Sequence, residues 1–297
     1  MSKISIIIPS RSERFLQNTV VDVLKNAAGD IEVIAVLDGH AHNVVLPPDP
    51  RVKTVIHPHP QGMRIAINSG VKAASGKYLM KSDGHCLFAP GFDEVLKADC
   101  EDNWVVIPRR YSLDAASWKI HRNRPVRDYH YLCFPDPHKD HDQGMHGVEW
   151  PERAAQHSDP KYDIDDNMSF QGSCWFMHKS WFTDFLEGMD ENPVFAGWAQ
   201  EPTEIGNKTW LGGGQVKVNK KTYYAHLHKG NAYGRGYLLD REGVITGHNF
   251  AAQYWMSNSW PKQIHNIDWL VEKFWPVPTW PEDRNLWVSP INVLRTI

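Results

Sequence analysis

Short apolar runs rich in β-branched residues alternate with amphipathic segments over the first hundred residues, and this alternation constrains the fold most strongly. The apolar runs are residues 4–8, 31–37, 52–56, 78–80 and 105–108, and helical spacing marks residues 15–24, 65–73 and 92–97. Repeated strand–helix–strand units build a parallel sheet that is covered by helices. We therefore expect an α/β fold that binds ligands beyond the carboxyl ends of its strands.

Composition excludes several classes of protein. The 297 residues are 41% hydrophobic and 23% charged with a net charge of −3, which excludes wholesale disorder and a global basic field. No apolar run approaches the roughly 20 residues that a membrane span needs. The four cysteines form no C-x-x-C pair, which favours reduced thiols. We expect a cytoplasmic protein, in the cytosol of a bacterium or a phage-infected cell, without an integral membrane segment.

Polar residues follow the expected strands at the edge where a ligand would bind. Pro9, Ser10 and Arg11 follow the first run, Asp38 follows the second, and Asp83-Gly84-His85 follows the fourth. A carboxylate and an imidazole two residues apart on an extended backbone project to the same side. Asp83 and His85 are therefore candidate ligands for one divalent cation.

Four ordered blocks resemble the nucleotide-sugar glycosyltransferases of the GT-A fold, broadly family 2. The blocks are residues 6–11 (IIIPSR), 36–39 (VLDG), 62–70 with 74–85 (GMRIAINSG, ASGKYLMKSDGH), and 198–204 with 210–214 (WAQEPTE, WLGGG). The resemblance covers about residues 3–235. It implies a mixed, mostly parallel Rossmann-like sheet flanked by helices, and transfer of a sugar from a nucleotide-sugar donor.

The D-x-H form of the metal motif is similar to that of the polypeptide N-acetylgalactosaminyltransferases. In those enzymes a later histidine completes the metal site, with a basic residue three positions on. Here residues 224–229 (YAHLHK) offer His226 with Lys229 at that spacing, and His228 is the alternative. The resemblance implies Mn²⁺ or Mg²⁺, and imidazole ligands favour Mn²⁺ somewhat.

The resemblance also implies how the donor, most simply a UDP-sugar, is held. Lys229, Arg64 and Arg235 would neutralise the diphosphate, beside the metal on Asp83. Asp38 would accept a hydrogen bond from the base or the ribose, whereas Pro9, Ser10 and Arg11 would line the nucleoside pocket. For Asp38 and Arg11, a turn cap and a surface arginine are the alternatives.

Glu201 is the candidate for the acceptor side of the reaction. Inverting family-2 enzymes place an acidic pair at this helix start, but the second acidic position is Pro202 here. Glu201 is therefore either a general base with inversion, or a contact to the donor sugar with retention of configuration. Glu204 is the fallback for either role, and a glutamate that merely stabilises a helix start is the structural alternative.

Residues 110–168 lack periodicity and form an expected irregular excursion on the acceptor side. Arg124 and Tyr129 from this segment, together with Trp198, are the candidate acceptor contacts. His138 and His141 could bind zinc, although their spacing fits no strong template. Residues 236–297 contain six tryptophans, and we expect them to form a helical extension packed on a catalytic domain of residues 1–235.

These observations predict a metal-dependent glycosyltransferase with a hydroxyl acceptor, most simply a glycan. A phage-type DNA glycosyltransferase that acts on hydroxymethylated pyrimidines is the first alternative. A non-catalytic carbohydrate-binding protein, which would use the tryptophans without Asp83, is the second, and a zinc hydrolase built on His138 and His141 is the third. Donor sugar and oligomeric state are not readable from the sequence.

Overall fold

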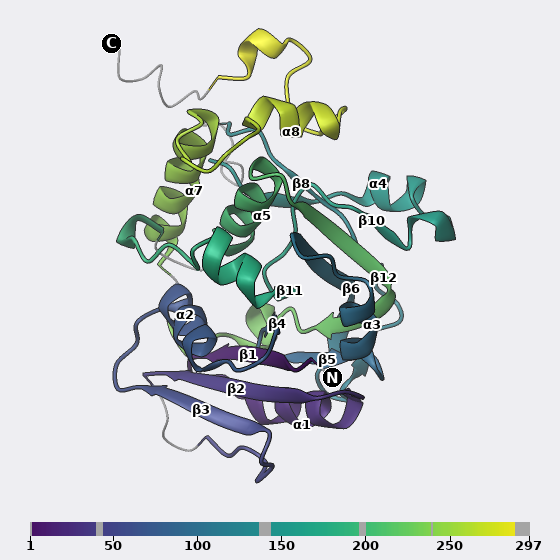
Figure 1. The fold of residues 1–297 in the computed structure, drawn as a ribbon, viewed down its shortest axis with the longest axis vertical. Helices are drawn as coiled ribbons and strands as arrows, with labels where there is room; N and C mark the ends of the chain where they lie inside the picture. Colours follow the sequence, from purple (N-terminus) through teal and green to yellow (C-terminus); the bar gives the residue numbers. More distant parts are fainter. Residues whose placement is uncertain (1, 40–43, 137–143, 196–199, 239, 289–297) are drawn as a thin grey trace.

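A computed structural model describes residues 2–39, 44–136, 144–195, 200–238 and 240–288. Its main sheet has the strand order β10-β12-β6-β11-β4-β1-β2-β3, with β5 paired to β12 and β7 paired to β6 (Figure 1). Strands β3, β2, β1 and β4 run parallel, and so do β6 and β12. Strand β11 is antiparallel to both of its neighbours, so it joins the two parallel groups into one mixed sheet.

The first half of the chain forms the elements that its periodicity predicts and one further strand, β5. They are β1 (Ile4–Ser10), α1 (Leu16–Asn26), β2 (Ile31–Asp38), β3 (Val52–His57), α2 (Met63–Ala73), β4 (Tyr78–Ser82), β5 (Cys86–Phe88), α3 (Phe92–Ala98) and β6 (Trp104–Asp114). Gly39 ends β2 with a φ of +78°, and a Cβ atom there would lie 2.3 Å from Pro60 Cδ. Only glycine fits this turn, which brings the end of β2 to the start of α2.

The second half contains more regular structure than the sequence predicts. Residues 110–168 are not wholly irregular, because they contain β7 (Lys119–Ile120), β8 (His130–Leu132), β9 (Gly147–Glu149), α4 (Pro151–Gln156) and β10 (Ile164–Asp166). These elements are too short to show a period. Strand β12 (Gln215–His226) is continuous, with a register shift between Asn219 and Tyr223.

The remaining elements lie around β11 (Cys174–His178) and at the C-terminal side. They are a π-helical turn at Trp181–Phe185, short 3-10 turns at Pro160–Tyr162, Pro193–Phe195 and Arg284–Leu286, and the helices α5 (Glu201–Leu211), α6 (Gly230–Tyr233), α7 (Arg241–Met256) and α8 (Ile267–Lys273). None of the helices in the described ranges is long and apolar enough to cross a lipid bilayer.

Successive side chains along the strands point to opposite faces of the sheet, and a hydrophobic core lies on each face. Ile6 and Ile8 pack with α1 and α3, whereas Ile7 packs with α2. The second core also takes in Trp210 of α5 and, from the C-terminal segment, Trp255, Trp260, Leu270, Trp280 and Trp287. Figure 1 shows α7 and α8 beside α5. Most of the tail tryptophans therefore pack against the same core as the sheet, and the indole of Trp280 donates to Leu132 O at 2.7 Å.

Glu32 of β2 connects its own strand to β1, to β3 and to Ser75, which follows α2. Its side chain is buried, with 3% exposed. It accepts hydrogen bonds from Ser5 Oγ on β1 at 2.6 Å, Ser75 N at 2.6 Å and Lys53 Nζ on β3 at 2.6 Å. Burial alone would raise its pKa, but the bonds from Lys53, Ser5 and Ser75 lower the pKa from 4.5 to about 2. The ionised carboxylate is therefore favoured in the folded state.

This pairing predicts an acid-sensitive component of stability. Because the folded-state pKa lies below the unfolded one, the contribution is present above pH 4.5 and is lost as the pH falls toward 2. It amounts to at most about 3 kcal/mol. Denaturant unfolding of Glu32→Gln should show a lower free energy at pH 7 and a flatter decline between these pH values. The exposed-site variant Glu101→Gln is the control, and an unchanged pH profile in Glu32→Gln would contradict the assignment.

Candidate active site

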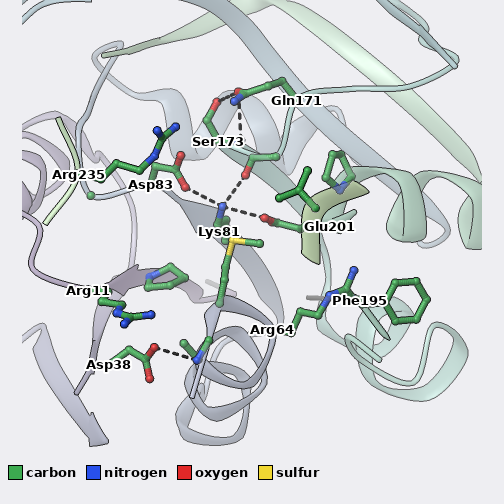
Figure 2. A pocket seen from close by; sticks show the side chains of 18 of the residues that line it. Arg11, Asp38, Arg64, Lys81, Asp83, Gln171, Ser173, Phe195, Glu201 and Arg235 are labelled. Carbon is green, nitrogen blue, oxygen red and sulfur yellow. Dashed lines mark hydrogen bonds and ion pairs between the residues drawn. The ribbon is translucent and has the colours of Figure 1, made fainter. Parts of the chain in front are cut away.

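A cavity of about 690 Å³ opens where the carboxyl ends of β1, β2 and β4 face the start of α5 and the end of β12 (Figure 2). Strand β1 lies between β2 on one side and β4 on the other, so the strand order reverses at β1. Open α/β sheets bind ligands at such a point, beyond the carboxyl ends of the strands. All the expected donor contacts line it: Pro9, Ser10, Arg11, Asp38, Arg64, Asp83, Lys229 and Arg235. His85, Glu201, His226 and His228 also contribute to the lining.

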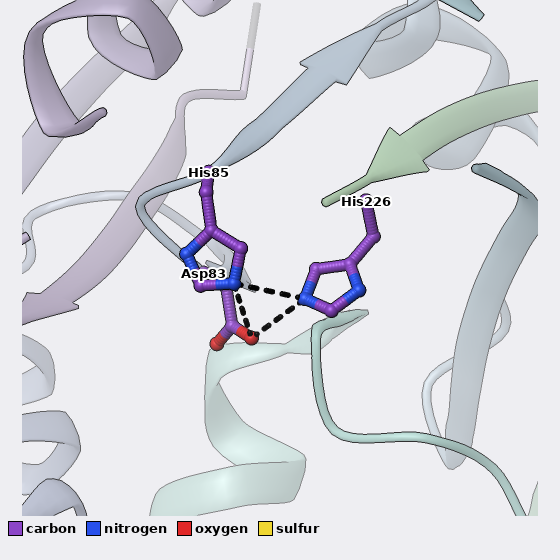
Figure 3. A group of neighbouring side chains, drawn as sticks. All are labelled: Asp83, His85 and His226. Atoms are coloured by element: carbon purple, nitrogen blue, oxygen red, sulfur yellow. Dashed lines mark hydrogen bonds and ion pairs between the residues drawn. The ribbon is translucent and has the colours of Figure 1, made fainter. Parts of the chain in front are cut away.

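Asp83, His85 and His226 bring three potential metal ligands together at the wall of the cavity (Figure 3). His226 Nε2 lies 3.0 Å from His85 Nε2 and 3.3 Å from Asp83 Oδ2, and His85 Nε2 lies 3.8 Å from Asp83 Oδ2. Two atoms that each lie about 2.1 Å from one ion are separated by roughly 3–3.5 Å. The donor set therefore fits a single divalent cation, and its mixed oxygen and nitrogen character suits Mn²⁺.

The protonation states of His226 and Asp83 also suit metal binding. Burial lowers the pKa of His226 to about 3 despite the nearby Asp83 carboxylate, so the imidazole is neutral. Burial alone would raise the pKa of Asp83, but Lys81 and the two imidazoles hold it far below its usual range. Metal ligands must be a neutral imidazole and an ionised carboxylate, which are the forms favoured here.

The structure brings His226, and not His228, to the other two ligands. His228 is exposed, and its ring centroid lies 6.4 Å from that of His226. It lines the cavity without belonging to the ligand cluster. His226 terminates β12, which pairs with β5 through the contact of His226 with Cys86, and this pairing sets its position beside His85.

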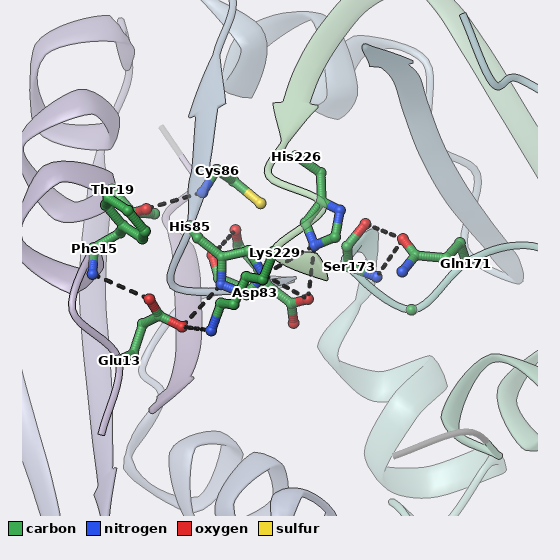
Figure 4. A network of polar contacts seen from close by, with 12 residues as sticks. Glu13, Phe15, Thr19, Asp83, His85, Cys86, Gln171, Ser173, His226 and Lys229 are labelled. Carbon is green, nitrogen blue, oxygen red and sulfur yellow. Dashed lines mark hydrogen bonds and ion pairs between the residues drawn. The ribbon is translucent and has the colours of Figure 1, made fainter. Parts of the chain in front are cut away.

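Glu13 supports the cluster from behind, and the sequence analysis did not identify it. Its Oε2 accepts a hydrogen bond from His85 Nδ1 at 3.0 Å and is also bonded by Lys229 Nζ (Figure 4). Burial would raise the pKa of Glu13, but His85 and Lys229 lower it below its usual value. A carboxylate on Nδ1 directs the Nε2 lone pair of His85 toward a metal, as in carboxylate–histidine–metal arrangements.

Lys81 connects the candidate metal ligands to Glu201, and it too was missed. Its side chain is 1% exposed, and Nζ donates to Asp83 Oδ1 at 2.8 Å, Gly172 O at 2.5 Å and Glu201 Oε2 at 3.1 Å (Figure 2). Burial would lower the pKa of Lys81, but the two carboxylates raise it above its usual value. The ammonium is therefore charged and all three of its N–H groups are bonded.

Glu201 lies at the first turn of α5 with both of its oxygens engaged. Oε1 accepts from Trp175 Nε1 at 2.6 Å and Oε2 accepts from Lys81. Burial raises the pKa of Glu201, and the attraction of Lys81 does not fully offset this effect. Its carboxylate is thus held in one orientation at the cavity wall, opposite the side on which Asp83 lies.

Two donor-side residues have further partners within the protein. Asp38 is 3% exposed, and its carboxylate accepts from the backbone N–H groups of Gln61 and Gly62 at 2.8 and 2.9 Å and from His57. It therefore stabilises the start of α2 as well as lining the cavity. Arg11 lies with its Cζ 5.0 Å from the ring centroid of Tyr237, which also lines the cavity.

The structure places two candidates away from the cavity lining. Both oxygens of Glu204 are engaged: Oε2 accepts from Arg64, and Oε1 accepts from Asp190 N at 3.0 Å and from Lys208 Nζ at 2.8 Å. Tyr129 is 1% exposed and donates to Asp165 at 2.7 Å. Glu204 is thus a partner of Arg64, and Tyr129 is a core residue, because burial and local partners that the sequence does not reveal occupy their polar atoms.

The other candidate acceptor contacts, Arg124 and Trp198, are not found at the cavity lining within the described residues. Arg124 is exposed and does not line the cavity. Trp198, His138 and His141 lie outside the described residues. The cavity lining instead includes His130, His146 and Gln171, which the sequence analysis did not identify as site residues.

Glu13 provides a test of the metal site that leaves the three ligands intact. Glu13→Gln removes the negative charge on His85 Nδ1 and should weaken Mn²⁺ binding by about 10–100-fold, measured by calorimetric titration. Glu94→Gln, a carboxylate outside the cavity on α3, should bind Mn²⁺ like the wild type. Equal Mn²⁺ affinity in folded Glu13→Gln and wild-type protein would contradict this role.

Comparisons with known proteins agree with this geometry. The model of the family "Glycosyl transferase family 2" matches residues 5–186. A Drosophila melanogaster protein that carries the name polypeptide N-acetylgalactosaminyltransferase 13 is 22% identical over 248 aligned residues, and the match covers 77% of this chain and 42% of that protein. The chain therefore spans less than half the length of that relative.

Two solved structures share the fold. GalNAc-T7 with UDP, GalNAc and Mn²⁺ has a TM-score of 0.66 and 14% identity over 86% of this chain and 49% of that one. Residues 1–349 of S. aureus TarS with UDP-GlcNAc give 0.57 and 12% identity over 88% of this chain and 68% of that one. The fold is thus the GT-A fold expected from the sequence. Because the family model matches more than half of its residues, the chain belongs to glycosyl transferase family 2.

Proposed function

We propose that this chain is a metal-dependent glycosyltransferase that moves a sugar from a UDP-sugar to a hydroxyl group of a glycan acceptor. The observation that carries the proposal is the Asp83–His85–His226 cluster in a cavity that all the expected donor contacts line. Both structural neighbours were solved with UDP or a UDP-sugar, one of them with Mn²⁺, which supports the choice of nucleotide and metal.

The reaction requires a negative leaving group to be stabilised. The bond between the sugar C1 and the diphosphate oxygen breaks and its electrons leave with the diphosphate, while the acceptor oxygen bonds to C1 and its hydroxyl proton is released. A divalent ion on Asp83, His85 and His226 would supply positive charge as a Lewis acid. Arg235 and Arg11 line the same side of the cavity as Asp83, where they would bind the phosphates and the nucleoside (Figure 2).

Glu201 is better placed to bind the donor sugar than to act as a general base that must move. Trp175 and Lys81 already hold its two oxygens, so the carboxylate has a fixed orientation at the cavity wall. A sugar hydroxyl can donate to such an oxygen without any proton transfer. This supports the retaining alternative, in which Glu201 orients the sugar.

Donor binding provides the direct test. UDP at 100 times its dissociation constant, with Mn²⁺, should stabilise the wild type by about 2.7 kcal/mol in a thermal-unfolding assay. Asp83→Ala should lose the Mn²⁺-dependent part of this shift and the transfer activity while remaining folded. Asp30→Ala, an exposed carboxylate outside the cavity, should behave like the wild type. If neither UDP nor UDP-sugars bind the wild type, with or without metal, the proposal is wrong.

A second acceptor class, hydroxymethylated DNA, is favoured by cations beside the cavity. The backbone N–H of Arg127 bonds Arg110 O at 3.0 Å, and β6 places Arg110 opposite Tyr224 of β12, two residues before His226. Burial lowers the pKa of His228, and the charges of Arg127, Arg110, Arg124 and Arg235 lower it further. Glu149 pairs with Arg127 at 2.9 Å and offsets its charge, but Arg110, Arg124 and Arg235 still act on His228 as positive charges, and phosphate binding requires such charges.

On this second function, a duplex that contains hydroxymethylcytosine should bind in a gel-shift assay and accept labelled sugar. Arg124→Ser should weaken DNA binding and reduce its dependence on salt, because one phosphate contact is lost. Arg51→Ser, remote from the cavity, is the matched control. Transfer to a glycan with no binding of the modified duplex would exclude DNA as the acceptor.

A further inference from the structure

A second cavity lies between α4 and the C-terminal segment, and the proposed function makes no use of it. It encloses about 500 Å³, and its lining comes from residues 150–156 on one side and residues 274–282 on the other. None of its lining residues belongs to the lining of the candidate active site. We call this cavity the tail groove, because Trp275 and Trp280 of the C-terminal segment line it.

The wall formed by residues 274–281 (FWPVPTWP) is rigid. Its three prolines restrict the backbone. Two hydrogen bonds fasten it to the end of β8 and the residues that follow: Thr279 Oγ1 accepts from Phe134 N at 2.9 Å, and the Trp280 indole donates to Leu132 O at 2.7 Å. A ligand would therefore meet a wall that is already formed, and its binding would lose little conformational entropy.

Trp275 presents its indole to solvent within the tail groove. It is 38% exposed and is the one exposed tryptophan in the described ranges, whereas Trp150 and Trp280 of the same lining are 6% and 5% exposed. Trp280 and Trp287 donate their indole N–H groups to carbonyl oxygens, but Trp275 Nε1 has no hydrogen-bond partner among the described residues. The groove therefore offers a single indole that is available to a ligand.

The polar residues that line the tail groove are mainly hydrogen-bond acceptors. Glu152, Gln156 and Glu282 are exposed, and within the described ranges their side chains make no hydrogen bond or ion pair. Arg153 is the one cation of the lining, and its guanidinium is stacked against three aromatic rings, with Cζ between 5.0 and 5.5 Å from their centroids. Two carboxylates and one guanidinium make the lining negative overall.

The charged residues next to this lining in the chain do not reverse its sign. Arg284 pairs with Glu272, and Lys273 pairs with Asp166 at 2.7 Å. Asp283 adds a further carboxylate, which accepts from a backbone N–H group. The negative character of the groove therefore extends to its surroundings, which disfavours nucleic acid and other polyanions as ligands.

The aromatic and polar groups of the groove together select a neutral sugar. A cationic ligand is bound by several aromatic faces that surround it, and only Trp275 is exposed here. The hydroxyl groups of a sugar donate to carboxylate and amide oxygens, such as those of Glu152, Glu282 and Gln156. The C–H groups of a sugar ring pack against the negative face of an indole.

We propose that the tail groove is a second site, separate from the active-site cavity, that binds a neutral glycan chain through Trp275, Glu152 and Glu282. This inference goes beyond the proposed function and does not depend on it. Glu149 lines the active-site cavity and Trp150 lines the groove, so consecutive residues serve the two sites. A glycan held in the groove would stay near the active site, which raises its effective concentration there.

The experiment applies the whole chain to an array of neutral oligosaccharides of glucose, galactose, mannose, xylose and N-acetylglucosamine, and measures the bound members by calorimetric titration. At least one of them should bind the wild type, both with and without UDP and Mn²⁺. Trp275→Ala removes the exposed indole and should weaken that binding by about tenfold or more. The double variant Glu152→Ala/Glu282→Ala keeps the indole, removes both carboxylates and should weaken binding by about threefold or more.

Controls separate the tail groove from the active-site cavity. Trp269→Ala, at a half-buried tryptophan outside the groove, should bind the glycan like the wild type, and so should Asp83→Ala. The inference is overturned if no oligosaccharide of the array binds, or if binding is unchanged in both groove variants. Loss of binding in folded Asp83→Ala would assign the glycan to the active-site cavity instead.

Other occupants are tested in the same way, with choline and a proline-rich peptide as probes. If either binds the groove and no glycan does, the inference is wrong and the groove serves that other class of ligand. Failure of UDP to bind the wild type, by contrast, overturns the proposed function and leaves the glycan measurement as the test of the groove.

Discussion

A single buried ammonium group, that of Lys81, connects the two walls of the cavity. It lies on β4 near the middle of the sheet and bonds Asp83 on one side, Glu201 on the other and the carbonyl of Gly172. Asp83 and Glu201 would repel each other without a cation between them, and an unpaired buried charge costs several kcal/mol. The strand that provides the metal ligand and the helix that forms the opposite wall are therefore set relative to each other by electrostatics as well as by apolar packing.

This arrangement separates two kinds of charge within one cavity. Asp83, His85 and His226, supported by Glu13, form a site suited to a divalent ion and a diphosphate. The opposite wall carries Glu201, whose carboxylate is held in one orientation by Trp175 and Lys81 and suits a contact to a sugar. A nucleotide sugar has the same division between a highly charged diphosphate and a mostly hydroxylated ring. The polarity of the cavity thus matches the proposed donor along its length.

The sequence predicted more of the site than of the polar shell that supports it. Asp83, His85 and His226 could be identified from the sequence because residues at the ends of neighbouring strands meet at one edge of the sheet. Glu13 lies only two residues beyond Arg11 at such an end, so the same rule would have identified it. Lys81 gave no such signal, because a lysine inside a strand pattern is normally exposed. Tyr129 and Glu204 lie away from the cavity lining, because burial and the partners Asp165 and Arg64, which are distant in sequence, engage their polar atoms.

The sequence by itself determined the parallel strands β1 to β4 with their helices, the edge of the sheet that carries the site, and the family, since all of these follow from local periodicity and ordered motifs. Tertiary structure alone decided that β11 runs antiparallel between β4 and β6, that His226 and not His228 joins the ligands, and that the buried Lys81 lies between Asp83 and Glu201. These outcomes depend on pairing between strands and on burial, which arise from contacts between residues far apart in the chain.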